Sequence, residues 1–468
     1  MSRAPSGGTR DFLVTAGLTL ASRLPFIGPG YGLDADAWRV AWSARTFATT
    51  GHYEVSRFPG YPLQELGCAL LWRGGPYALC GATALLSALA AGFFCLCLRR
   101  LGSRHAVLAA LAMASVPAIY IASVQALDLP WGLALALAAL WLALDGRALA
   151  AGLLTGLAIG TRVTWILWLV PLAGALPAAG WHGGRGAARV RLVAGALIVG
   201  ALSFALSFRI YGTGFLRFYQ DHYPATLLVL KNLSVGLWGL PGTLALLVVL
   251  PVALLRRWHR DARDGLPGAD TGLLLGVVGG MVLFLAAYLR LPWKALYLIP
   301  LAPLLLLVLN ARLHHRAFVA LCAALLISPW LLDLNMAGAG LESRGAIAFR
   351  LADCTGTLEP LRGPLLTDYV RRVAAMRYVD AVLARAGRMR GETVVVAGDW
   401  SPMLRVRLGG RVQGDVRYAP LMGTVELRAL RARGVPVYYL RNAEWTNAQS
   451  PAGGDLVAGE ARELDLAE

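Results

Sequence analysis

Residues 76–98 read PYALCGATALLSALAAGFFCLCL, a stretch without a charged side chain, and Arg99 and Arg100 follow it directly. A helix of about 20 apolar residues spans the roughly 30 Å hydrocarbon core of a bilayer. Similar stretches recur along the chain, which has 468 residues and is 57% hydrophobic but only 15% charged. A soluble protein of this length needs more charge to cover its surface. The sequence therefore predicts a polytopic integral membrane protein.

We expect about eleven transmembrane helices, with bounds that hold to within several residues. The expected spans are 11–30, 76–98, 105–124, 130–145, 148–162, 163–180, 192–211, 236–255, 271–290, 295–311 and 317–333. They predict a membrane module over residues 1–333, in which the loop over 31–75 carries juxtamembrane helices. Gly152, Gly156 and Gly160 lie four apart, a spacing that favours close contact between helices.

The net charge of +17 comes almost entirely from arginine. The arginines lie in short loops between apolar stretches instead of along one polar face, which argues against a nucleic-acid partner. Every second loop carries them, as expected for cytoplasmic loops under the positive-inside rule. With an odd number of spans, the amino terminus is cytoplasmic and the tail is extracytoplasmic. The arginine bias suggests a bacterial protein of the inner membrane.

The tail over 334–468 changes character. An amphipathic helix is expected at 366–388 and a second helix at 423–433, while Thr393–Val396 and Val435–Leu440 favour short strands. Strands that alternate with helices predict a small α/β domain. No glycine-rich phosphate loop follows these strands.

The first outward loop opens with two aspartates, Asp34 and Asp36, at the start of a predicted helix. Carboxylates at a helix start cap its free N–H groups and favour its positive end. The same acids, placed just above the bilayer, are candidates for chemistry. The residues alone leave both interpretations open.

Further polar side chains are expected on the same outer face. They are His52, Arg57, Tyr61, Asp128, Arg162, His222, Arg290, Lys294 and Tyr297. Outward loops usually avoid arginine and lysine, so cations kept there indicate an anionic partner such as a phosphate. Each cation alone is equally well explained by snorkelling to lipid headgroups. Together, acids on the first loop and cations on later loops predict one shared cavity.

Several motifs follow one another along about the first 330 residues. They are Asp34 with Asp36, Gly51–Pro62, Asp128, Gly152–Arg162 and Lys294–Pro303. In this order they resemble the GT-C superfamily of polyprenyl-phosphate-sugar glycosyltransferases, most closely the branch with the lipid A aminoarabinose transferases and protein O-mannosyltransferases. The resemblance implies a membrane enzyme that moves a sugar from a polyprenyl-phosphate donor to a lipid, glycan or protein acceptor on the outer membrane face.

The resemblance also implies roles for individual residues. The acid after the first span is the catalytic base in that family, so Asp34 is implied as base. Asp36 is the alternative, because Ala35 separates two acids that relatives often place side by side. Arg57, Arg162 and Lys294 would hold the donor phosphate, Asp128 matches a second acidic position, and the anomeric centre would be inverted. No cofactor is implied with certainty; two outer acids permit a divalent metal without requiring one.

Two other classes of protein fit parts of the sequence. Arg23 within the first span and the short spans near 148–180 suit the substrate path of a transporter or flippase of envelope precursors. A non-catalytic scaffold of envelope assembly, whose tail recruits partners, is the third interpretation.

Overall fold

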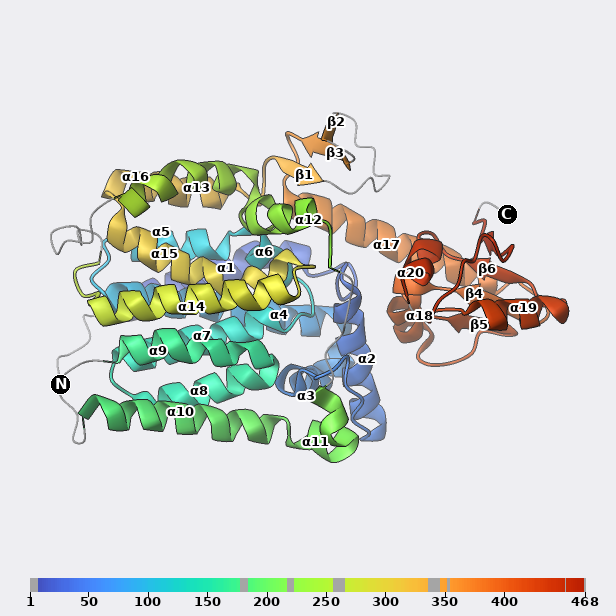
Figure 1. Cartoon of the computed structure of the whole chain (residues 1–468), viewed down its shortest axis with the longest axis horizontal. Coiled ribbons are helices and arrows are strands. Elements are labelled where there is room, and N and C mark those ends of the chain that lie inside the picture. Colours follow the sequence, from blue (N-terminus) through green and yellow to red (C-terminus); the bar gives the residue numbers. More distant parts are fainter. Residues whose placement is uncertain are drawn as a thin grey trace.

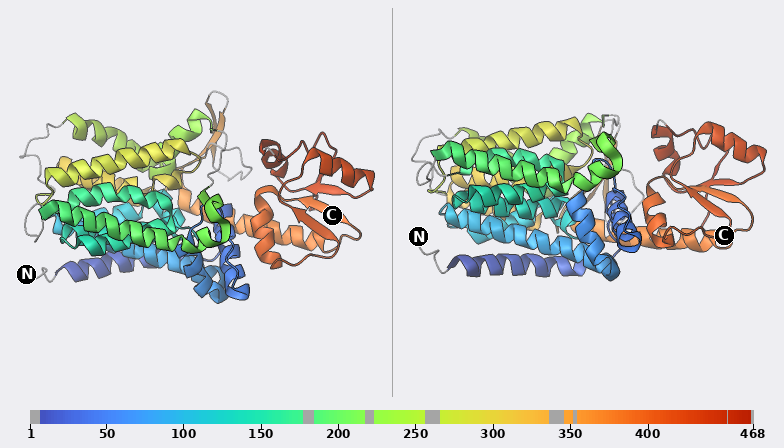
Figure 2. Two further views of the ribbon diagram at one scale, coloured as in Figure 1. Left: turned by 60° about the horizontal axis from the view of Figure 1, so that its bottom comes forward. Right: turned by 90° about the horizontal axis from the view of Figure 1, so that it is seen from below.

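The structure, a computed structural model, describes residues 7–176, 184–216, 223–255, 266–335, 346–351, 354–450 and 452–466. Most helices form a bundle along the longest axis of the molecule, and a small α/β unit lies beyond one end of it (Figures 1 and 2). Helix α2 (Ala35–Thr50) crosses that end of the bundle, nearly at right angles to the other helices. The apolar bundle makes the chain a polytopic helical membrane protein.

The bundle contains helices of very different lengths. They are α1 (Gly7–Arg23), α4 (Gly75–Arg100), α5 (Ala106–Ala114), α6 (Pro117–Ser123), α7 (Leu129–Leu144), α8 (Ala148–Thr161), α9 (Leu169–Ala175), α10 (Gly184–Ser203), α13 (Leu237–Leu255), α14 (Thr271–Arg290), α15 (Leu301–Arg312) and α16 (His315–Ile327). Three short helices lie at the same end: α3 (Pro62–Leu71), which packs against α2; α11 (Ala205–Tyr211); and α12 (Thr226–Lys231).

Helical residues occur within all eleven predicted spans, but few helices are long enough to cross a bilayer alone. Four described segments are long and apolar enough: Pro62–Arg100, Gly184–Ser203, Thr226–Leu255 and Thr271–Arg290. The bent pair α5–α6 makes a fifth if it is one span. The other bundle helices are shorter, so the number of eleven spans stays a prediction.

The third predicted span is broken into α5 and α6, which meet at an angle of 67°. Pro117 begins α6 and has no N–H to continue the hydrogen bonding of α5. Arg23, 1% exposed, donates to the Ala114 carbonyl at the end of α5 and, at 3.2 Å, to the Ser123 hydroxyl. Arg23 therefore satisfies polar groups at the break between α5 and α6. This role does not support the transporter interpretation, which placed Arg23 on a substrate path.

The glycines of α8 allow α8 and α10 to lie in direct contact. A Cβ atom at Gly152 would stand 2.3 Å from the carbonyl oxygen of Leu192, and one at Gly156 would stand 2.5 Å from Cβ of Val199. No larger side chain fits there without moving a helix backbone. This confirms the packing role predicted from the glycine spacing.

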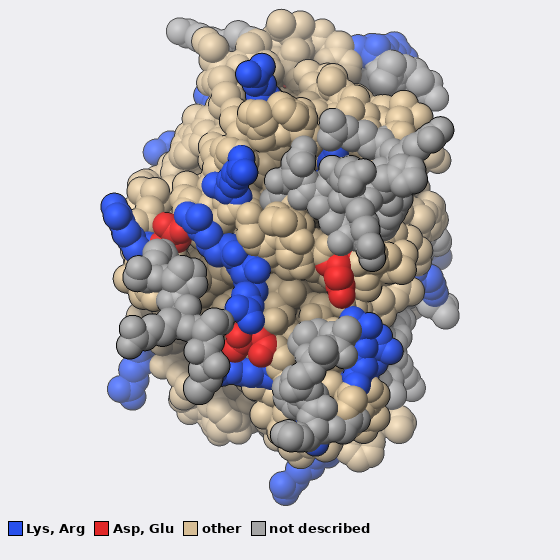
Figure 3. Space-filling model, turned by 90° about the vertical axis from the view of Figure 1, so that its left-hand side faces the viewer, with Lys and Arg blue, Asp and Glu red and all other residues tan. Residues whose placement is uncertain are grey.

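Basic side chains gather at the end of the bundle opposite to α2 (Figure 3). Ion pairs join some of them to acids of the same end, as between Arg147 and Asp145 at 3.2 Å and between Arg185 and Asp270 at 3.4 Å. The loop over 31–75 and its acids lie at the other end, beside α2. The two sets of loops that the arginine pattern distinguishes thus occupy opposite ends of the bundle.

After α16 the chain forms two sheets. The first is antiparallel, in the order β1-β3-β2, from β1 (Asp333–Asn335), β2 (Ile347–Leu351) and β3 (Cys354–Glu359). The second is parallel, in the order β5-β4-β6-β7, from β4 (Thr393–Val396), β5 (Val416–Ala419), β6 (Val437–Tyr439) and β7 (Arg462–Glu463). Its helices are α17 (Pro364–Ala386), α18 (Ser401–Leu408), α19 (Thr424–Ala432) and α20 (Ala443–Gln449). The helices and strands expected in this part of the sequence are all present.

Helix α17 anchors the α/β unit to the bundle through a buried polar chain. Arg372 pairs with Asp368 at 2.8 Å and donates to the carbonyl of Phe26 at 2.9 Å. The second carboxylate oxygen of Asp368 accepts from the Gln125 amide at 2.9 Å, and the oxygen of that amide accepts from the Leu33 backbone N–H at 3.1 Å. The chain of contacts ends one residue before Asp34. A buried ion pair of this kind is weak evidence for stability, but these contacts join α17 to the start of α2.

Candidate functional site

Asp34 and Asp36 stand at the start of α2. Asp34 is its N-cap residue, and its Oδ1 accepts a hydrogen bond from the backbone N–H of Asp36 at 3.0 Å. Asp36 lies in the first turn of the helix, where the helix dipole favours a negative charge. The capping interpretation of these two acids is therefore correct. The cap also fixes where both carboxylates point.

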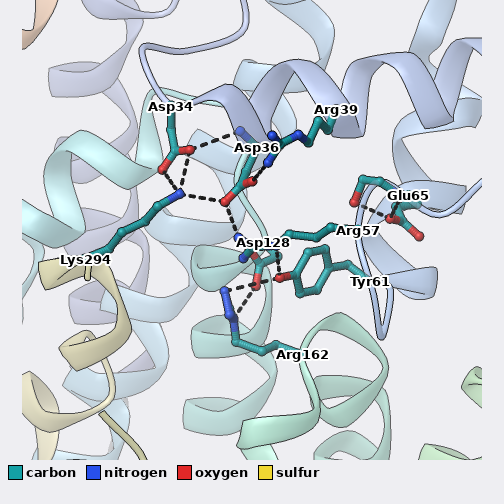
Figure 4. A network of polar contacts seen from close by, with 10 residues as sticks. Asp34, Asp36, Arg39, Arg57, Tyr61, Glu65, Asp128, Arg162 and Lys294 are labelled. Atoms are coloured by element: carbon teal, nitrogen blue, oxygen red, sulfur yellow. Dashed lines mark hydrogen bonds and ion pairs between the residues drawn. The ribbon is translucent and has the colours of Figure 1, made fainter. Parts of the chain in front are cut away.

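Both carboxylates point to one ammonium group (Figure 4). Lys294, in the loop after α14, places Nζ 2.7 Å from both carboxylate oxygens of Asp34 and 2.7 Å from Oδ2 of Asp36. Lys294 lies 260 positions after Asp34 in the sequence. The side chain of Lys294 is 32% exposed and those of Asp34 and Asp36 are 17% and 8% exposed, so the group borders solvent.

A second layer of cations lies beneath this group. Arg57 donates to Oδ2 of Asp36 and to the hydroxyl of Tyr61. Arg162 donates to Oδ2 of Asp128 at 2.8 Å and to the same Tyr61 hydroxyl at 3.5 Å. The tyrosine hydroxyl thus links two guanidinium groups that come from different loops.

Two further side chains complete this arrangement. Arg39 pairs with Oδ1 of Asp36 at 2.9 Å, and the Arg162 guanidinium lies 4.8 Å from the centre of the Tyr297 ring. The polar cluster consists of Asp34, Asp36, Arg39, Arg57, Tyr61, Asp128, Arg162, Lys294 and Tyr297. Its four cations face three carboxylates, so it carries one net positive charge. A site of this charge suits an anionic ligand.

Ion pairs keep both Asp36 and Lys294 in their charged forms. Burial alone would raise the pKa of Asp36, but Arg57 and Lys294 hold it well below its usual range. Burial would lower the pKa of Lys294, yet Asp34 and Asp36 raise it above its ordinary value. Deeper in the site, burial raises the pKa of Asp128 against the opposing effect of Arg162 and Arg57.

The loop that carries Arg57 and Tyr61 is held by an acid that the sequence analysis did not select. Glu65 of α3 accepts hydrogen bonds from the Tyr53 hydroxyl and, at 2.8 Å, from the Ser56 backbone N–H. Glu65 is 1% exposed, so it acts from within the fold to position the loop. Arg39 was also missed, although its position three residues after Asp36 allows pairing on one helix face.

Most of the outer side chains expected to share a cavity do come together, but not all. His52 is exposed, and Arg290 lies exposed at the end of α14; neither joins the polar cluster through a described contact. The turn after α14 brings Lys294 to Asp34 and leaves Arg290 outside the described contacts of the polar cluster. The inclusion of His52 and Arg290 in the site stays a prediction. His222 lies outside the described residues.

The residues of the polar cluster do not fit a divalent metal. Within the described ranges, no group of three or more His, Cys, Asp or Glu side chains is placed to hold an ion. Asp34 and Asp36, the two acids that permitted a metal in the sequence analysis, share the ammonium of Lys294 instead.

A cavity of about 560 Å³ opens between the polar cluster and the α/β unit. Asp34, Asp36 and Lys294 line it from the bundle, and Asp399, Trp400 and Met403 line it from the α/β unit. The sequence alone does not indicate a role for the latter three, because no charge pattern marks them.

Comparison with known proteins gives a fold. No protein-family model matches the sequence. No curated protein matches it either. Among solved structures, ArnT from Cupriavidus metallidurans in the apo state aligns with a TM-score of 0.51 and 16% identity, over 92% of this chain and 89% of that chain. The structure of the same enzyme bound to undecaprenyl phosphate aligns with a TM-score of 0.49 and 15% identity, over 93% and 90% of the two chains.

The chain therefore shares the fold of ArnT. This shared fold agrees with the resemblance predicted from the sequence. At such low identity the likeness does not extend to substrates or to individual residues.

Proposed function

We propose that the chain is a membrane glycosyltransferase that moves a sugar from a polyprenyl-phosphate donor to an acceptor hydroxyl on the outer face of the inner membrane. The observation that carries this proposal is the polar cluster itself, which gathers four cations and three carboxylates at one end of an apolar bundle. Charged groups that are largely removed from water are costly unless they pair with one another or with a ligand.

The cations suit the phosphate of the donor. The described contacts of Arg57 and Arg162 use two N–H groups of each guanidinium, and a guanidinium has five. Both arginines therefore retain donors for a phosphate. Lys294 has only three N–H groups, so a phosphate that binds it must take the place of a carboxylate.

The reaction follows from these charges. The oxygen of the acceptor hydroxyl attacks the anomeric carbon of the donor sugar, and the bond from that carbon to the phosphate oxygen breaks. The bonding electron pair leaves with the phosphate, whose added negative charge Lys294, Arg57 and Arg162 stabilise. The hydroxyl proton passes to an aspartate. A single displacement of this kind inverts the anomeric centre.

Asp34 is the better candidate for the base. Both oxygens of Asp36 are occupied by cations, Oδ1 by Arg39 and Oδ2 by Arg57 and Lys294, and its lowered pKa makes it a weak base. Asp34 has Lys294 as its one described cation partner and is twice as exposed, at 17% against 8%. A phosphate that attracts Lys294 would release the carboxylate of Asp34 next to the anomeric carbon.

The orientation in the membrane follows from the two ends of the bundle. The arginine-rich end is cytoplasmic under the positive-inside rule, so the polar cluster and the α/β unit are extracytoplasmic. The transporter interpretation has less support, since Arg23 is engaged in packing. The polar cluster also disfavours the scaffold interpretation, because a non-catalytic scaffold does not require such a cluster.

The first prediction concerns orientation. Alkaline phosphatase fused after Asn335 should be active, because this enzyme needs the disulfides that form outside the cytoplasm. The same reporter fused after Gly146, in an arginine loop, should be inactive. Reporter activity in whole cells measures both. The reverse pattern would place the polar cluster on the cytoplasmic side and contradict the proposal.

The second prediction concerns the phosphate. Lys294→Ala should weaken the binding of undecaprenyl phosphate to the purified chain ten- to a hundredfold, since a hydrogen bond to a charged group contributes about 1.5–3 kcal/mol. Arg290→Ala, a matched control four residues earlier at the end of α14, should bind within twofold of wild type. Equilibrium binding in nanodiscs measures this. An equal loss of affinity in both variants would indicate a general attraction between positive charge and the phosphate. An unchanged affinity in Lys294→Ala would show that Lys294 does not bind the phosphate.

The third prediction concerns the base. Asp34→Asn should lower the rate of sugar transfer by about 10²–10⁴, while undecaprenyl phosphate still binds. Asparagine caps a helix nearly as well as aspartate, so α2 should remain intact. Single-turnover transfer from a panel of polyprenyl-phosphate sugars to acceptors in the native membrane measures the rate, with Asp145→Asn at the opposite end as control. Near-wild-type rates in both Asp34→Asn and Asp36→Asn would refute aspartate catalysis here.

A further inference from the structure

The cavity above the polar cluster has two walls of different origin. Its volume of about 560 Å³ lies in the range of roughly 300–1,000 Å³ typical of small-molecule sites. The bundle contributes the carboxylates and the ammonium, and the α/β unit contributes an aromatic ring and a third carboxylate. A ligand in this space would touch both parts of the chain at once.

The wall from the α/β unit is the place where a parallel sheet ordinarily binds its ligand. In the order β5-β4-β6, the chain leaves β4 for β5 on one side and then returns to β6 on the other. Open α/β sheets bind ligands at such a switch point, outside the carboxyl ends of the strands. Asp399 and Trp400 lie in the turn that directly follows β4. The sheet and the polar cluster therefore face the same cavity.

The ring of Trp400 is held in a fixed position. Its Nε1–H donates to the Arg441 carbonyl at 3.0 Å, in the loop after β6, and its ring lies 4.6 Å from that of Tyr378 on α17. Asp399 beside it accepts from the Thr446 hydroxyl at 3.5 Å and is exposed. The result is a pre-organised aromatic surface with a carboxylate at its side.

The wall from the α/β unit is also fixed against the bundle. Arg405 of α18 pairs with Glu54 at 3.0 Å, and its guanidinium lies 4.1 Å from the centre of the Trp42 ring on α2. The chain from Asp368 through Gln125 to Leu33 joins α17 to the residue before Asp34. The two walls are thus positioned by contacts on both sides of the cavity.

The charge of the cavity differs from that of the site beneath it. Asp34, Asp36 and Asp399 oppose Arg39 and Lys294, and both cations already pair with carboxylates. The space is therefore slightly acidic and repels a second anion. Arg57 and Arg162 lie below, where the donor phosphate is proposed to bind.

We infer that this cavity is the acceptor site and that the acceptor presents a neutral sugar ring to it. The apolar face of the ring lies on Trp400, Asp399 accepts hydrogen bonds from its hydroxyls, and one hydroxyl reaches Asp34. Aromatic side chains with a few convergent polar groups are the ordinary lining of such sites. This inference rests on the proposed function, because it takes Asp34 as the base.

The test uses the full chain in nanodiscs and neutral probes. Binding of a panel of methyl glycosides of glucose, mannose, galactose and N-acetylglucosamine is measured by saturation-transfer NMR, and glucose 1-phosphate serves as the anionic comparison. Wild type should bind at least one neutral glycoside more tightly than glucose 1-phosphate. Trp400→Ala should lower that affinity at least tenfold, and Trp400→Phe, which keeps an aromatic face, should retain most of it. Trp445→Ala, at a tryptophan of α20 that is 61% exposed, should behave as wild type.

Undecaprenyl phosphate binding separates this inference from the proposed function. It should be unchanged in Trp400→Ala, which also shows that the variant is folded. If wild type binds no neutral glycoside, or binds glucose 1-phosphate more tightly, the inference that the acceptor presents a neutral sugar is overturned. Glycoside binding that survives in Trp400→Ala overturns the role of Trp400. If wild type binds a glycoside but does not bind undecaprenyl phosphate, the acceptor site is supported and the proposed polyprenyl-phosphate donor is refuted.

Discussion

The ammonium of Lys294, 2.7 Å from the carboxylates of Asp34 and Asp36, joins the loop after α14 to the start of α2. Charges that are partly removed from water cost several kcal/mol each unless they are paired with good geometry. Here the helix N-terminus, Arg39 and Arg57 supply the remaining partners of the two acids. The end of the bundle is therefore organised around paired charges, and the loss of Lys294 would leave Asp34 without its described cation partner.

This balance connects the membrane part to the α/β unit. Leu33, one residue before the N-cap of α2, donates to Gln125, and Gln125 donates to Asp368 on α17. Arg405 of α18 pairs with Glu54, in the loop after α2, and its guanidinium lies over the Trp42 ring of α2. Because α2 carries both acids, a displacement of the α/β unit would also displace them. The α/β unit is thus part of the site geometry and not an appendage of the bundle.

The sequence predicted the helical segments well, because apolar stretches such as 130–145 have one structural solution in a bilayer. It also predicted the glycine packing on α8 and that acids of the first loop lie near cations of later loops. It did not predict the break between α5 and α6, where Arg23 satisfies a carbonyl that no pattern marks. Arg290 and Lys294 looked equivalent, since both are outward cations four residues apart. The turn between them, which only the tertiary fold determines, separates their roles. Trp400 could not be predicted as a site residue, because a single aromatic side chain occurs in cores, at membrane interfaces and in binding sites alike.

The central claim is that the polar cluster holds the phosphate of a lipid donor. The most direct measurement is an experimental structure of the chain in nanodiscs with undecaprenyl phosphate. The account predicts phosphate oxygens within hydrogen-bonding distance of Lys294, Arg57 and Arg162, with the ammonium of Lys294 drawn away from Asp34. A phosphate bound elsewhere, with the contacts between Lys294 and Asp34 unchanged, would contradict it.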